Sequence, residues 1–231
     1  GRASGERSVW PRAANREHVT LTDGPAGMLP PGSVCDMRVT LRGILAAPGV
    51  GHGCIGSKIR VVRYARENNM PCLSISLGMR CAVIEFARNV LGYEDADSTE
   101  MRKTTHPVID LMEEQKGVMD KGGTMRLGAY PGRITAPSNL FDAYGTDLIY
   151  ERHRHRYEFN NDYTETFAAA GLKPVGINPD SNLVEAVELE GHLWFIGVQY
   201  HPEYKSTVSR PHPLFKAFVA AAMRYDDSLQ A

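Results

Sequence analysis

The chain has 231 residues and a net charge of −1, so it is long enough for one well-buried domain and does not require two. That charge lacks the excess of Lys and Arg on which non-specific nucleic-acid binding depends. The sequence also has no apolar run near the roughly 20 residues that a membrane-spanning helix needs. We therefore expect a globular protein that binds neither nucleic acid nor membrane.

Four cysteines are scattered along the chain: Cys35, Cys54, Cys72 and Cys81. None belongs to a CxxC pair or lies at zinc-ligand spacing from a histidine, so we predict no metal site and no cofactor. Scattered cysteines in a chain of this size favour a reducing compartment, and we expect a cytoplasmic location.

The first 17 residues mix arginines with small residues and lack the apolar stretch of a secretory signal. An organelle-targeting leader has a similar composition, but Glu6 and Glu17 argue against one. We interpret residues 1–17 as a disordered or variable tail and residues 18–231 as one folded domain.

Strand and helix patterns alternate after this tail. An apolar strand over residues 43–46 runs into a turn rich in Gly and Pro. A helix is predicted over residues 57–69, then a buried-type strand over 72–75 and a second, amphipathic helix that ends at Gly92. This order indicates an α/β domain with its functional residues at the carboxyl ends of the strands.

The later part of the chain has fewer clear elements. Residues 100–160 are polar and Gly-rich, and we expect them to form excursions from the sheet. An aromatic-rich strand is predicted over residues 193–199, and a final helix carries an apolar face from Leu214 to Ala222.

Ser76 lies at the predicted turn from strand to helix, where a nucleophile elbow presents its reactive side chain. The helix N-terminus and its backbone N–H groups would face a developing oxyanion there. A small residue before a helix is also a common cap, so the turn alone does not indicate catalysis.

His201 and Glu203 strengthen the catalytic interpretation, because a carboxylate can hold an imidazole in the tautomer that acts as a base. Without the elbow, we would prefer the interpretation that His201 is merely hydrogen-bonded in a turn beside Pro202.

Longer strings resemble a known family. They cover residues 68–71, 75–79, 84–92, 97–100, 122–128, 151–158, 198–204 and 212–215. Over about residues 42–222 the chain resembles the glutaminase domain of CTP synthase, a class I glutamine amidotransferase. The strings at 122–128 and 152–158 distinguish this family from other class I amidotransferases.

The resemblance implies a fold and a reaction. The fold is a single α/β domain whose central, largely parallel sheet is flanked by helices. In the family a cysteine thiolate attacks the side-chain amide of glutamine, and the ammonia released aminates UTP to CTP in a synthase domain. L-glutamine is therefore the expected ligand, and a separate synthase domain or subunit is the expected partner.

Roles follow from the resemblance residue by residue. His201 is the implied base, Glu203 its orienting partner, and Ser76 occupies the nucleophile position. The oxyanion hole falls on Gly49 and on the N–H of Leu77. The implied substrate-binding residues are Gly49, Leu77, Gly78, Met79, Arg80, Glu100 and Arg156.

Two arginine-containing strings have plainer interpretations. The run over residues 152–156 is compatible with a basic patch or a solvated face, although the resemblance favours a substrate-binding Arg156. Arg126 is interpreted as structural or interfacial.

Departures from the family cluster at the reaction centre. Ser76 replaces the cysteine with an alcohol that is essentially never ionised near neutral pH, so hydrolysis should fall by several powers of ten. Ser74 replaces a glycine and is expected to strain the turn. Arg80 replaces a glutamine and adds positive charge beside the glutamine site. Pro48 removes an N–H just before Gly49.

The start of the chain departs as well. Nothing before Val19 matches the family, and residues 19–23 are a candidate second strand, so the first βα unit is predicted to be missing or altered.

Three functions are compatible with these residues. The leading hypothesis is a CTP-synthase-type glutaminase domain that has lost, or nearly lost, glutamine hydrolysis. The alternatives are a Ser-His-Glu hydrolase that uses Ser76, and a non-catalytic paralogue that binds glutamine or acts as a scaffold. An engineered Cys→Ser change would explain Ser76 alone, whereas the other departures favour a diverged paralogue. We reject Cys72 and Cys81 as substitute nucleophiles, because neither should point toward His201.

Overall fold

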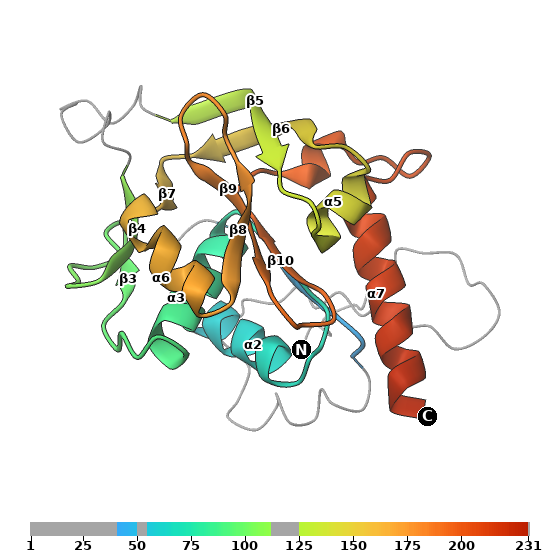
Figure 1. Ribbon diagram of the computed structural model, residues 1–231, viewed down its shortest axis with the longest axis horizontal. Helices are drawn as coiled ribbons and strands as arrows, with labels where there is room; N and C mark the ends of the chain where they lie inside the picture. Colours follow the sequence, from blue (N-terminus) through green and yellow to red (C-terminus); the bar gives the residue numbers. More distant parts are fainter. Residues whose placement is uncertain (1–40, 50–54, 112–124, 231) are drawn as a thin grey trace, which may run out of the picture.

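The computed structural model describes residues 41–49, 55–111 and 125–230 (Figure 1). Its strands are β1 (Ile44–Ala46), β2 (Cys72–Ile75), β3 (Asp97–Ser98), β4 (Pro107–Leu111), β5 (Arg126–Ile134), β6 (Leu148–His155), β7 (Tyr157–Phe159), β8 (Leu172–Ile177), β9 (Val184–Leu189) and β10 (Phe195–Val198). Its α-helices are α2 (Ile55–Glu67), α3 (Leu77–Asn89), α5 (Asn139–Tyr144), α6 (Thr164–Ala169) and α7 (Pro213–Gln230). Two 3-10 helices, η5 (Asn161–Tyr163) and η6 (Pro202–Lys205), complete the elements of these residues. The predicted single α/β domain is confirmed.

In the described part of the chain, the main sheet has seven strands in the order β1-β2-β10-β9-β8-β5-β6. Only β1 with β2 and β2 with β10 pair in parallel, and the other four pairs are antiparallel. The expectation of a largely parallel sheet is therefore wrong. Connections as short as those from β8 to β9 and from β9 to β10 can join only antiparallel neighbours, whereas β1 and β2 are joined through α2.

The region expected to form excursions contributes to the main sheet instead. Strands β5 and β6 are its last two strands, while β3, β4 and β7 form a separate three-stranded sheet among the described residues. Along β6, exposed and buried residues alternate at every position. The buried positions near its end hold His153 and His155 rather than apolar residues. The alternation of apolar and polar residues that would predict a strand is therefore missing from the sequence there.

Helices cover both faces of the main sheet (Figure 1). One core cluster joins α2 and α3 to the sheet, and a second joins α5 and α7 to it. Helix α3 is buried from Leu77 through Ala87, so the amphipathic helix predicted there is in fact enclosed on all sides. It packs against α2, β10 and β4, which fixes the start of α3 relative to the sheet.

Several predictions concern the N-terminal region. The tail over residues 1–17 and the candidate strand over residues 19–23 lie outside the described residues. Strand β1 has one neighbour among the described strands, β2, and is therefore an edge of the main sheet there. No helix in the described ranges has the length and apolar character needed to cross a membrane.

Candidate functional site

Ser76 forms a sharp turn between β2 and α3. Its backbone has φ 52° and ψ −106°, a conformation that residues other than glycine rarely adopt and that clusters at functional sites. The Ser76 N–H donates to the carbonyl of Val198 on β10 at 2.7 Å, and the N–H of Arg80 donates to the Ser76 carbonyl at 3.1 Å. The side chain makes no helix-capping hydrogen bond, so the interpretation of Ser76 as an ordinary cap is not supported.

The residues after Ser76 pack the elbow tightly onto the sheet. A Cβ on Gly78 would lie 2.0 Å from the carbonyl oxygen of Ala46, so only glycine fits between α3 and β1. Met79 is fully buried and its side chain packs against Gly197 on β10. The side chain of Met79 is therefore part of the core between α3 and β10.

The two residues predicted for the oxyanion hole lie close together. A Cβ on Gly49 would be in ordinary contact, 3.8 Å, with Cδ2 of Leu77. Leu77 is the first residue of α3, so its N–H belongs to the helix N-terminus, where partial positive charge gathers. Gly49 and the elbow are thus neighbours, as the resemblance implies.

His201 follows β10 at the same edge of the sheet as Ser76, because β2 and β10 are parallel and Ile75 is in register with Val198. Nδ1 of His201 lies 2.6 Å from Oε1 of Glu203. The ring of His201 stacks on that of Tyr204, with 4.9 Å between centroids, and its backbone N–H donates to the carbonyl of Arg152 at 2.8 Å. Nε2 of His201 is buried and accepts or donates no hydrogen bond within the described ranges.

The predicted substrate-binding charges lie beside the elbow. Nη1 of Arg80 donates to Oε2 of Glu100 in an ion pair. The pKa of the Tyr157 hydroxyl is raised, mainly by burial and further by the carboxylates of Glu100 and Asp110. The guanidinium groups of Arg156 and Arg80 oppose this rise. Arg80 and Glu100 are thus in direct contact, and both act electrostatically on Tyr157, the neighbour of Arg156 in the chain and a residue that the sequence analysis missed.

The sequence profile of class I glutamine amidotransferases matches residues 32–221. The chain belongs to this family. The CTP synthase of Flavobacterium psychrophilum is 55% identical over 221 residues, which cover 95% of this chain and 41% of that protein. With so little of the chain outside it, this match includes residues before Val19, so the expectation that nothing there matches the family is wrong. The CTP synthase of Christiangramia forsetii is 60% identical over 183 residues, which cover 79% and 34% of the two chains. The amidotransferase chain thus spans less than half the length of these relatives.

Solved structures agree with this assignment. The glutaminase domain of Trypanosoma brucei CTP synthase, solved with bound acivicin, is 36% identical with a TM-score of 0.79, over 86% of this chain and 78% of that one. A proposed GMP synthase subunit from Thermoplasma acidophilum is 14% identical with a TM-score of 0.56, over 86% of this chain and 80% of that one, and shares the fold alone. The predicted resemblance to the CTP synthase glutaminase domain is confirmed.

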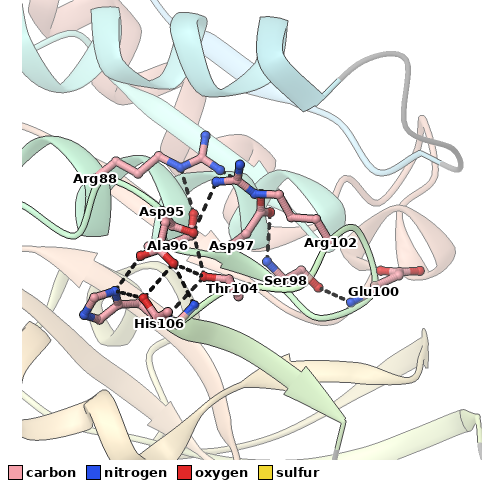
Figure 2. Close-up of polar contacts among 10 residues, drawn as sticks. Arg88, Asp95, Ala96, Asp97, Ser98, Glu100, Arg102, Thr104 and His106 are labelled. Atoms are coloured by element: carbon pink, nitrogen blue, oxygen red, sulfur yellow. Dashed lines mark hydrogen bonds and ion pairs between the residues drawn. The ribbon is translucent and has the colours of Figure 1, made fainter.

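In this amidotransferase domain, the segment that carries Glu100 is held to α3 (Figure 2). Asp97 accepts a hydrogen bond from Nη2 of Arg88 on α3 at 2.8 Å and pairs with Nε of Arg102 at 2.6 Å. The N–H of Glu100 then donates to Oγ of Ser98 at 3.2 Å. Because Arg88 and Ser76 belong to one helix and its preceding turn, these contacts fix Glu100 relative to the elbow.

A second set of contacts holds the base of the same segment (Figure 2). Asp95 lies 2.6 Å from Nδ1 of His106 and accepts hydrogen bonds from Thr104 and Thr105. The hydrogen bond with His106, followed by those with Thr105, holds the pKa of the Asp95 carboxyl well below its ordinary value. Both ends of the segment before β4 are therefore tied together through Asp95.

A buried polar layer joins strands β5, β6, β7 and β9. Arg126 on β5 donates to Glu158 at 2.9 Å and to Glu185 at 2.7 Å, and His155 lies 2.7 Å from the same oxygen of Glu158. Arg126 is enclosed by these carboxylates, which agrees with its interpretation as structural. Burial, and then the charge of Arg126, lowers the pKa of His153 to about 2, so this ring is neutral in the folded domain.

Gln199 is another polar residue that the sequence analysis did not single out. It is fully buried one residue after β10, and neither amide atom of its side chain has a hydrogen-bond partner among the described residues. A polar residue between apolar Val198 and Tyr200 is the sequence signal that could have indicated it. Buried amides without partners are rare in native proteins and often mark functional positions or ordered water.

The neighbourhood of the elbow does not favour another nucleophile. Cys72 and Cys81 are buried, and burial raises the pKa of each thiol to about 12. Ser74 is fully buried with its Oγ 3.5 Å from Sγ of Cys72, and its backbone is ordinary strand. Ser74 does not have a positive φ, which falls on Ser76 instead. Cys35 and Cys54 lie outside the described residues, within which no group of His, Cys, Asp and Glu could hold a metal ion.

Proposed function

We propose that this chain acts as the glutamine-binding domain of a CTP-synthase-type protein, in which Ser76 strongly impairs glutamine hydrolysis. The observation that carries the proposal is the elbow itself: a non-glycine residue held at positive φ, with an uncapped side chain at a helix N-terminus. Only a tightly packed environment maintains such a backbone conformation. The residue at this position of the chain is Ser76, so the side chain presented there is a hydroxyl. The remaining residues of the site fit the role implied by the family.

The proposed division of labour follows from the chemistry of each group. Glu203 holds the His201 ring so that Nε2 faces away from it and can accept the proton of the attacking group. The helix N-terminus at Leu77 and the backbone at Gly49 would stabilise negative charge on the amide oxygen. A thiol would give its proton to His201 readily, whereas the hydroxyl of Ser76 holds its proton far more tightly.

A partner completes the proposed activity. Since the relatives are more than twice as long, we propose that ammonia from this domain, or glutamine occupancy of it, serves a synthase domain or subunit that binds UTP. We propose that residues 18–231 form one domain. We also propose a cytoplasmic location, and two cysteines of the described chain support it because they are free and buried: Cys72 and Cys81.

Ammonia release from glutamine tests the proposal. The purified chain should release ammonia at least about a thousandfold more slowly than its Ser76→Cys variant, because restoring the thiol restores an ionisable nucleophile. A rate in the unmodified chain equal to that of Ser76→Cys would contradict the impairment. Failure of Ser76→Cys to gain any activity would show that Ser74, Arg80 or Pro48 has disabled the site as well.

A Ser-His-Glu hydrolase is the second candidate, and the His201–Glu203 pair beside a serine elbow is the observation that favours it. It predicts that a fluorophosphonate probe labels Ser76 and that His201→Ala abolishes the labelling, because the base would no longer accept the hydroxyl proton. Absence of labelling in the unmodified chain removes this candidate.

A further inference from the structure

Arg80 places a guanidinium at the elbow. It lies in the first turn of α3, and its N–H donates to the carbonyl of Ser76 at 3.1 Å. The residue is only 8% exposed, and its side chain pairs with Glu100. Its Nε is buried without a partner among the described residues. The charge of Arg80 is therefore directed at Glu100 rather than at solvent.

The ion pair changes what Glu100 offers to a ligand. A carboxylate recognises the α-ammonium group of an amino acid, and a guanidinium recognises its α-carboxylate. The pair of Arg80 and Glu100 has no net charge, whereas Glu100 beside a neutral residue would carry −1. An α-ammonium group near Glu100 therefore meets repulsion from Arg80 that offsets the attraction of the carboxylate.

The other charges near Tyr157 leave this balance unchanged. Asp110 accepts a hydrogen bond from the hydroxyl of Thr99 at 2.6 Å and from the N–H of Leu111 at 2.8 Å. The proposed function assigns the guanidinium of Arg156 to a ligand carboxylate, and no described residue takes the hydrogen bond of its buried Nε. Glu100, in contrast, is already matched by Arg80 within the chain.

We infer that Arg80 determines the ligand specificity of this site. Its guanidinium supplies beside Glu100 the positive charge that the α-ammonium group of an amino acid would otherwise supply. The inference rests on the proposed function for the location of the ligand. The class of ligand it favours is a carboxylic acid with a terminal carboxamide and no α-ammonium group. Glutaramate, which is glutamine without its amino group, is the simplest member and keeps the amide for the elbow and the carboxylate for Arg156.

Titration calorimetry with glutamine and glutaramate tests the inference on the full chain. The unmodified chain should bind glutaramate at least about tenfold more tightly than glutamine, since one charge-assisted hydrogen bond is worth about that factor or more. Arg80→Gln should reverse the preference, because Glu100 then regains its charge for the ammonium group. Arg80→Lys keeps a cation beside Glu100 and should keep the preference for glutaramate.

Each other outcome counts against a defined claim. Tighter binding of glutamine by the unmodified chain, or an unchanged ratio in Arg80→Gln, overturns the role of Arg80 and leaves the proposed function standing. If neither ligand binds the unmodified chain or Arg80→Gln, the proposed amide site itself is wrong. If Arg80→Gln does not fold, Glu100→Gln provides the test. This variant leaves the charge of Arg80 without its carboxylate, so the ratio of the affinities for glutaramate and glutamine must shift further toward glutaramate. An unshifted ratio overturns the inference.

Discussion

Nδ1 of His201 lies 2.6 Å from Oε1 of Glu203, and the opposite nitrogen of the same ring is buried without a partner in the described residues. The carboxylate accepts a hydrogen bond from Nδ1–H, so the neutral ring carries its lone pair on Nε2. That arrangement is what a general base at this edge of the sheet requires. The arrangement is present beside a serine, as the proposed role of His201 as the base requires.

The pair should therefore control any activity that a thiol restores. In the Ser76→Cys background, His201→Ala is expected to lower ammonia release from glutamine by about 10²- to 10⁴-fold, because the base is lost. Glu203→Gln should also lower it, since the ring is no longer held in one tautomer. Glu190→Gln, which removes an exposed carboxylate paired with Lys173, is the matched control and should have no effect. Equal rates for Glu203→Gln and Glu190→Gln would contradict the orienting role.

Arg156 and Arg154 provide a second matched comparison. Arg154 is exposed on β6, whereas Arg156 follows the strand and lies near Tyr157 with a buried Nε. A saturating carboxamide acid should raise the melting temperature of the unmodified chain, with about 1.4 kcal/mol of stabilisation at ten times the Kd. The rise should vanish in Arg156→Ala and persist in Arg154→Ala. Thermal melts with glutamine and with glutaramate measure this, and equal shifts in both variants would exclude Arg156 from the site.

The elements around the elbow could be predicted from the sequence because their signals are local. Strand β2 has the predicted bounds, and α2 begins and ends two residues before the predicted helix. The turn at Ser76 follows from the abrupt change between a strand period and a helix period. The pairing of His201 with Glu203 was also predictable, since only two positions separate them along the chain.

The errors and omissions arise where distant segments meet. The order and direction of the strands depend on pairings that no local pattern encodes, so the sheet was expected to be more parallel than it is. Arg126 and Glu185 are 59 positions apart, and their ion pair gives no signal in the sequence. The sequence predicted that Arg80 adds charge beside the substrate site, but only the structure shows that Glu100 receives that charge.

Gly78 should be indispensable to the elbow, whereas Gly56 should not matter. A Cβ on Gly78 would lie 2.0 Å from a backbone oxygen, while a Cβ on Gly56 in α2 has no atom within 4 Å. Gly78→Ala is therefore expected to cost at least about 3 kcal/mol of unfolding free energy through overpacking. Gly56→Ala should be neutral or stabilising by up to about 1 kcal/mol, because alanine favours the helix. Urea unfolding of both variants gives the two values, and similar values would refute the close contact with Ala46.

Arg126 should contribute to the stability of the fold and not to catalysis. Its side chain is 7% exposed between Glu158 and Glu185, whose side chains are 2% and 1% exposed. Arg126→Ala leaves two buried carboxylates without their cation and is expected to destabilise the domain by about 3 to 5 kcal/mol in urea unfolding. Arg133→Ala removes a pair with Asp147 in which both side chains are more than half exposed, and should change stability by less than about 1 kcal/mol. If both substitutions cost the same, the buried layer is not held together by Arg126, and the interpretation of this residue as structural is wrong.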